Sequence, residues 1–239
     1  MNSSRPPQGT IKALPLVFGG FIALASAMGI GRFVYTPILP KMVADLGLSA
    51  SEAGLIASAN FAGYLIGALV AAASFFAARQ RRWMLVGLAF SALSTAGMAA
   101  TTSLPLFVIL RFVGGVSSAF VLVFSSSLVM ERLTAAGKIR FASYQFAGVG
   151  TGIALSAALV ERLAANGIAW QWQWSATAFL SLLAFLAVAG LIGPAPQGIK
   201  STGSSTANGR MSAPLLALVL SYGLFGFGYV ITATFLVQL

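Results

Sequence analysis

The chain has 239 residues, of which 58% are apolar and only 8% are charged. This composition excludes an ordinary soluble domain and indicates an integral membrane protein, because the apolar residues form long continuous runs. The net charge of +10 would suggest a nucleic-acid partner in a soluble protein. Here almost all of the cations lie between the apolar runs, where they set membrane topology, so we expect no nucleic-acid partner.

Seven apolar runs are each long enough to cross a hydrocarbon core of about 30 Å. They cover residues 14–39, 50–77, 83–101, 105–130, 139–160, 171–193 and 213–237. The runs are continuous and rich in Ala, Leu and Gly, which favours helices over the alternating strands of an outer-membrane barrel. The sequence therefore predicts an all-α fold with the lipid bilayer as its surroundings.

Arg32 lies deep inside the first run, which contains no carboxylate. A charge in hydrocarbon is costly, so an intramembrane arginine is a candidate for a functional site. The glycines beside it, Gly29 and Gly31, allow close backbone approach, while Pro37 and Pro40 interrupt helix hydrogen bonding further along. We expect an anion near this arginine.

Arg111 is the second charge well inside a predicted span. Three groups are candidates to neutralise both arginines: an anionic substrate, carboxylates from further helices, or Asp45 and Glu52 at the outer mouth. In the alternative interpretation, each guanidinium binds backbone carbonyls at a helix break and never contacts substrate.

Neutral polar side chains inside the spans are candidates for lining a cavity with these arginines. Tyr35 and Thr36 lie three and four positions beyond Arg32 and so share its helical face. The others are Asn60, Tyr64, Gln145, Tyr222 and Tyr229. The alternative role for each of them is interhelical hydrogen bonding.

The loop charges predict an orientation. Loops on one side carry ten cations: Arg5, Lys12, Arg79, Arg81, Arg82, Arg132, Lys138, Arg140, Lys200 and Arg210. The opposite loops carry Lys41 and Arg162 together with three of the four acids. Cytoplasmic loops are enriched in cations, which predicts a multi-pass inner-membrane protein with a cytoplasmic N-terminus. Trp170, Trp172 and Trp174 are expected at the outer membrane interface.

Residues 194–212 form a polar stretch rich in Gly, Ser and Pro, which predicts a cytoplasmic linker. It separates a six-helix domain at 1–193 from a single helix at 213–239. The motif Gly226-Phe227-Gly228-Tyr229 echoes Gly29-Ile30-Gly31-Arg32 of the first helix. A repeat of this kind is typical of transporters built from two parallel halves.

These motifs resemble those of the major facilitator superfamily, and the phrase at residues 29–40 is similar to its bacterial YbfB/YjiJ-type branch. The resemblance implies a protein of twelve helices. On that basis this chain holds the N-terminal six-helix half and the first helix of the second half, and the remainder of the C-terminal half is missing. Arg111, Gly115 and Ala119 match the family's helix-four motif.

The stretch Arg79-Gln80-Arg81-Arg82 resembles the basic end of the family's loop between helices two and three. The resemblance assigns Arg79, Arg81 and Arg82 to an inner gate. Alanines at 77 and 78 replace the acid expected there, so the gate's salt bridge must be weaker or made differently.

The predicted function is therefore secondary transport of a small solute by alternating access, and an anion is the candidate for that solute. The alternative is a non-transporting fragment or a structural membrane module. Catalysis is not expected, because the chain has no His or Cys and no acid or Lys well inside a span. No cofactor or metal is predicted. The substrate, the transport direction and the coupling ion stay open.

Overall fold

A computed structural model describes residues 13–194 and four residues further along, which are Ala217, Leu220, Ser221 and Leu224. The chain divides into two compact units, Met1–Ser201 and Thr202–Leu239. In the second unit the four described residues are helical, and the Ser221 hydroxyl donates to the Ala217 carbonyl at 2.8 Å. The predicted contacts Tyr222 and Tyr229 lie outside the described residues, as does the predicted linker from residue 195 onward.

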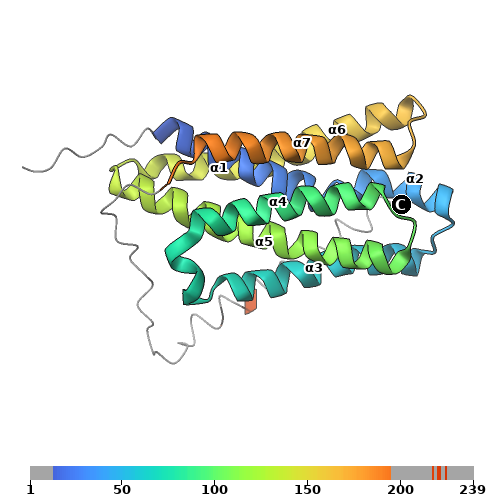
Figure 1. The fold of residues 1–239 in the computed structure, drawn as a ribbon, viewed down its shortest axis with the longest axis horizontal. Helices are drawn as coiled ribbons and strands as arrows, with labels where there is room; N and C mark the ends of the chain where they lie inside the picture. The colour runs from blue at the N-terminus through green and yellow to red at the C-terminus, as the bar shows by residue number, and fades with distance from the viewer. Residues whose placement is uncertain (1–12, 195–216, 218–219, 222–223, 225–239) are drawn as a thin grey trace, which may run out of the picture. The chain divides into compact units, whose positions relative to one another are not determined.

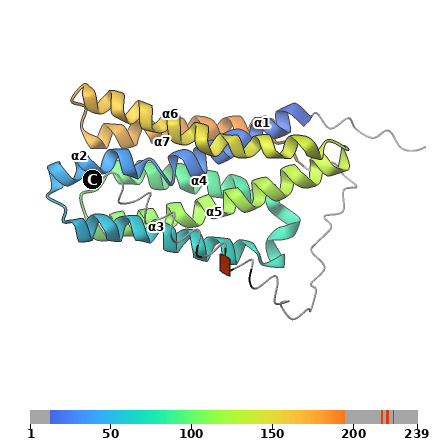
Figure 2. The same cartoon turned by 180° about the vertical axis from the view of Figure 1, so that it is seen from behind.

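The first unit is a bundle of long helices that run roughly side by side (Figures 1 and 2). Its elements are α1 (Ala13–Leu24), the π-helix η1 (Ala25–Ile30), α2 (Tyr35–Leu46), α3 (Ala50–Ala71), the 3-10 helix η2 (Ser74–Arg79), α4 (Gln80–Ala99), α5 (Leu104–Ala135), the 3-10 helix η3 (Ile139–Phe146), α6 (Ala147–Ala165) and α7 (Trp170–Leu191). Residues 13–194 contain no strand. The predicted all-α class is confirmed.

Within the described residues, five helical segments are long and apolar enough to cross a membrane: Ala13–Leu46, Ala50–Ala71, Leu104–Ala135, Ile139–Ala165 and Trp170–Leu191. The predicted span at 83–101 is a helix of similar length, α4, but it is not among these five. Its first turn holds Arg81 and Arg82, and Ser91, Ser94 and Thr95 add polar groups to its middle. The predicted span at 50–77 is wrong at its end, because α3 stops at Ala71 and η2 follows.

The start of α3 is encoded locally. The Ser49 hydroxyl accepts from the Glu52 amide at 3.2 Å, and the Glu52 carboxylate accepts from the Ser49 amide at 2.8 Å. This reciprocal pair is a capping box, which satisfies backbone donors that the first helical turn leaves open. The preceding helix α2 ends at Leu46 and is capped by Gly47, whose positive φ of 66° favours glycine.

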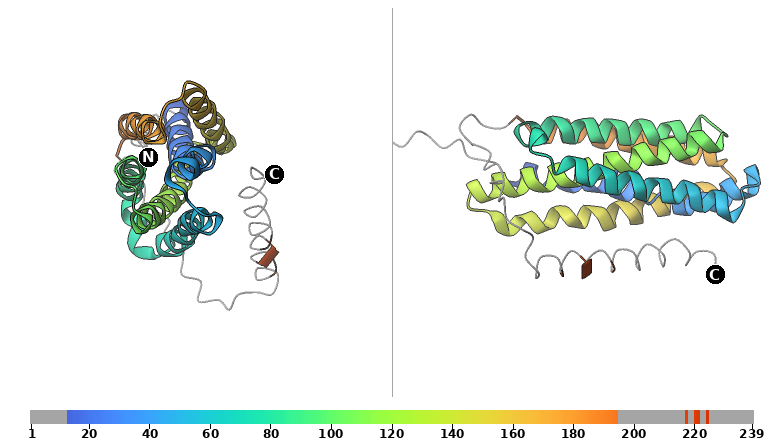
Figure 3. Two further views of the ribbon diagram at one scale, coloured as in Figure 1. Left: turned by 90° about the vertical axis from the view of Figure 1, so that its right-hand side faces the viewer. Right: turned by 90° about the horizontal axis from the view of Figure 1, so that it is seen from below.

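Close contact between α3 and α5 depends on small residues. A side chain at Gly63 would collide with the Phe112 carbonyl, and one at Gly115 would collide with the Asn60 carbonyl. Glycine pairs of this kind allow membrane helices to pack with their backbones in contact. The helix α5 also packs on α4, and α4 packs on α7. The left view of Figure 3 shows the bundle end-on.

Buried apolar side chains form two clusters along the bundle. One includes Leu16, Phe124 and Leu133, and the other includes Ile38, Phe107 and Trp174. Of the tryptophans expected at the outer interface, Trp170 and Trp174 have fully buried side chains, whereas Trp172 is exposed. A tryptophan near a helix end serves packing as readily as anchoring, and its position in sequence does not distinguish the two.

Candidate functional site

The first membrane-spanning segment is broken where the sequence singles out Arg32. The Gly31 amide donates to the Ser26 carbonyl at 2.8 Å, five residues back, which ends the π-helix η1. Residues 31–34 form turns, and the Thr36 amide then donates to the Phe33 carbonyl at 3.2 Å. The break therefore precedes the two prolines, and Pro40 lies inside α2.

Arg111 from α5 binds the carbonyls that this break exposes. Its Nη1 donates to the Gly31 carbonyl at 2.9 Å, and its Nη2 donates to the Arg32 carbonyl at 2.8 Å. The side chain is 5% exposed, and the guanidinium carbon lies 5.1 Å from the centre of the Tyr35 ring. Arg111 thus joins α5 to the broken helix, as the alternative interpretation of this residue predicts.

Arg32 has a different environment. Its guanidinium carbon lies 4.1 Å from the centre of the Tyr64 ring, 4.8 Å from that of Phe61 and 5.7 Å from that of Phe33. The side chain is half-buried. Aromatic faces stabilise a cation partly withdrawn from water. We call these three rings with Arg32 the arginine cage.

Two further predicted residues form hydrogen bonds between the segments that carry Arg32 and Arg111 and their neighbour α3. The Asn60 side-chain amide donates to the Arg111 carbonyl at 2.9 Å, and Asn60 itself is 1% exposed. The Tyr35 hydroxyl donates to the Ala53 carbonyl at 3.0 Å. Both polar groups therefore link helices, as the alternative role predicts. The structure brings together five of the predicted residues: Arg32, Tyr35, Asn60, Tyr64 and Arg111.

Of the two remaining predicted residues, Thr36 lies next to Tyr35, whereas Gln145 lies elsewhere in the bundle. Thr36 is half-buried at the start of α2, next to Tyr35. Gln145 is fully buried in η3, where it lies beside Gly20 of α1. Gly20 precedes Arg32 by twelve residues, which corresponds to about 18 Å along a helix. Its side-chain oxygen and nitrogen have no hydrogen-bond partner among the described residues. Gln145 therefore lies outside the arginine cage.

The three predicted inner-gate arginines differ in their contacts, because Arg81 alone among them is half-buried. Arg81 donates from Nη2 to the Ala189 carbonyl at 3.0 Å and from Nε to the Ile192 carbonyl. Arg79 and Arg82 are exposed. Arg81 therefore binds the open carbonyls at the end of α7, a position that favours cations.

Arg132 is a structural residue that the sequence interpretation missed. It lies in the last turn of α5, is 9% exposed, and donates from Nη1 to the Gly193 carbonyl at 3.0 Å. The sequence interpretation treats it as a loop cation, and no local signal indicates its burial because its acceptor is 61 residues away in the chain. In the described part of the chain, no group of three His, Cys, Asp or Glu residues is placed to hold a metal ion.

Comparisons with known proteins indicate the family of the chain. A family profile described as "Uncharacterised MFS-type transporter YbfB" matches residues 24–239. A chloramphenicol resistance protein from Streptomyces lividans is 34% identical over 108 residues, which are 44% of this chain and 27% of that protein. The matched region thus spans about a quarter of the length of this relative.

Proposed function

This chain belongs to the major facilitator superfamily of membrane transporters, and from that premise we propose that its cargo is a small organic anion with Arg32 as the main electrostatic contact. The single observation that carries the proposal is the arginine cage, a half-buried guanidinium against the rings of Phe33, Phe61 and Tyr64. A ring engages the flat face of a guanidinium, whereas the five N–H donors lie in its plane. A carboxylate suits those in-plane donors because it can accept two parallel hydrogen bonds.

The different environment of Arg111 supports the assignment of this role to Arg32. Arg111 donates to two backbone carbonyls and is nearly fully buried. Its contacts fix the position of the turn that carries Arg32, because one of the two carbonyls belongs to Arg32 itself. Arg111 thus acts as a positioning residue, and Arg32 as the residue that meets the solute.

The wider architecture is part of the same proposal. Residues 1–193 form an N-terminal transporter half, 194–212 a cytoplasmic linker, and 213–239 the first helix of a second half. The protein lies in the inner membrane with its N-terminus in the cytoplasm, and the two halves alternate access to the cage. The charge distribution of the loops and the echo of the Arg32 motif support this arrangement.

A test uses ligand-induced thermal stabilisation of the purified transporter with small carboxylates, each paired with its neutral amide. A ligand that binds the folded state raises the melting temperature by an amount that grows with its affinity. We expect the carboxylates to stabilise the wild type and their amides to have little effect. Arg32→Lys keeps the charge but loses the planar donors, so it should weaken the response, and Arg32→Met should abolish it.

Two outcomes of this test would contradict the proposal or favour a different cargo. Equal stabilisation of Arg32→Met and wild type by carboxylates would contradict the role of Arg32. Chloramphenicol belongs in the same panel, because a relative is named for resistance to it. Stabilisation by chloramphenicol that survives Arg32→Met would favour export of drug-like compounds over anion transport.

A further inference from the structure

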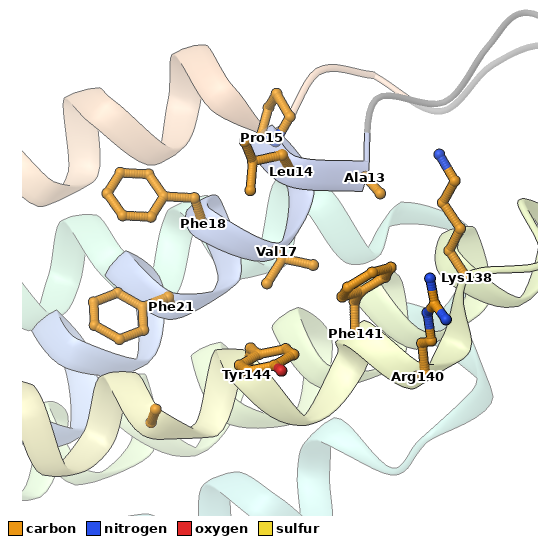
Figure 4. Close-up of a pocket in the computed structure, with 11 residues that line it drawn as sticks. Ala13, Leu14, Pro15, Val17, Phe18, Phe21, Lys138, Arg140, Phe141 and Tyr144 are labelled. Carbon is orange, nitrogen blue, oxygen red and sulfur yellow. The ribbon is translucent and has the colours of Figure 1, made fainter.

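A groove lies beside the start of the first helix, on the N-terminal side of the arginine cage. It has a volume of about 1040 Å³ and lies between the start of α1 and the segment formed by η3 and the first residue of α6. Its walls carry Phe18 and Phe21 from α1, and Phe141 and Tyr144 from η3 (Figure 4). Phe18 and Tyr144 are 53% and 62% exposed, so these rings present a large apolar surface beside the bundle.

Two cations stand at one end of this groove. Lys138 and Arg140 lie at the start of η3, on the same side of the view, whereas Phe18 and Phe21 lie toward the other end (Figure 4). Both cationic side chains are exposed, and the Arg140 guanidinium carbon lies 4.8 Å from the centre of the Phe141 ring. None of the described residues that line the groove is acidic.

We propose that this groove binds an anionic phospholipid, with the headgroup phosphate at Lys138 and Arg140 and an acyl chain along the aromatic wall. The walls of the groove belong to segments that are long and apolar enough to cross a membrane, and the medium beside such segments is the hydrocarbon of the bilayer. Cations at helix ends lie at the level of the headgroups, and basic pockets between helices attract acidic lipids. The apolar wall is complementary to the acyl chain of the lipid, and the two cations are complementary to the negative charge of its phosphate.

This site is separate from the proposed solute site. Phe21 is the lining residue of α1 nearest to Arg32 and precedes it by eleven residues, which is about 16 Å of helix. The residues that line the groove therefore include none of the arginine cage.

The test is native mass spectrometry of the purified chain after incubation with equal amounts of phosphatidylglycerol and phosphatidylcholine of identical acyl chains. We expect the wild type to retain phosphatidylglycerol preferentially. Lys138→Gln with Arg140→Gln should lower that preference by about fivefold for each charge removed at low salt. Arg79→Gln with Arg82→Gln is the matched control, because these exposed arginines lie outside the groove and their loss changes the net charge equally.

A second pair of variants tests the groove itself. Ala147 is exposed and lines the groove, so Ala147→Trp should fill the space and lower retention of both lipids. Ala154 is exposed about two turns further along α6 and does not line the groove, so Ala154→Trp should retain lipid like the wild type. The proposal fails if wild type shows no preference for phosphatidylglycerol, if glycerol phosphate competes as well as the lipid, or if Ala147→Trp leaves lipid retention unchanged.

Discussion

Two arginines that the sequence presents as similar intramembrane charges have different structural roles. Arg111 donates to the carbonyls of Gly31 and Arg32 at the break in the first span. Leaving a buried carbonyl without a partner costs about 1–3 kcal/mol, while removing the buried guanidinium recovers part of that cost. Arg111→Met should therefore lower the free energy of unfolding by about 2 kcal/mol, as measured by denaturant titration in detergent micelles with tryptophan fluorescence.

The matched control is the same substitution at Arg32, whose guanidinium lies against aromatic rings and is half-buried. Arg32→Met should leave the unfolding midpoint closer to the wild-type value, because methionine also packs well on aromatic rings. Arg111→Lys should recover part of the loss, because one carbonyl regains a donor. A stability loss in Arg32→Met as large as that in Arg111→Met would remove the distinction between the two residues.

Helix packing depends on the position of individual glycines within one element. In α6, a side chain at Gly152 would collide with the Ala25 carbonyl of η1, whereas one at Gly150 would have nothing within 4 Å. Overpacking of this kind costs about 1–3 kcal/mol, and alanine is otherwise the better helix former. Gly152→Ala should therefore destabilise the fold by that amount in the same titration.

Gly150→Ala provides the comparison, since it adds the same methyl group to the same helix. It should be neutral or slightly stabilising. Similar losses in both variants would mean that the helix α6 and the segment η1 are not held in the close contact that the structure describes.

At the scale of the whole molecule, the cation distribution predicts an orientation that reporter fusions can measure. Gly137 precedes η3 and Gly167 precedes α7, and both are turn glycines with positive φ and open surroundings. A reporter after Gly137 should be cytoplasmic and one after Gly167 external, because basic loops stay inside. The reverse assignment at either position would overturn the proposed topology.

Local patterns in the sequence determined the class of the protein and most of its helices. Apolar runs of sufficient length predicted the long helices of residues 13–194, although not the separate helix α2 or the end of α3 at Ala71, and the Ser49–Glu52 spacing predicted the cap of α3. Both signals depend on residues close together in the chain, so they can be interpreted without tertiary structure. The family's helix-four motif and the phrase around Arg32 likewise indicated the superfamily that the profile match then established.

Tertiary structure alone decided how the polar residues are used. Arg111 and the carbonyls that it binds are about 80 residues apart, and the periodicity of neither segment indicates which arginine will reach the break. The same holds for Arg81 and Arg132, whose acceptors at the end of α7 are distant in sequence, and for Gln145, which is buried away from the cage. A polar side chain in a membrane helix must find a partner, but packing between distant segments determines which partner it meets.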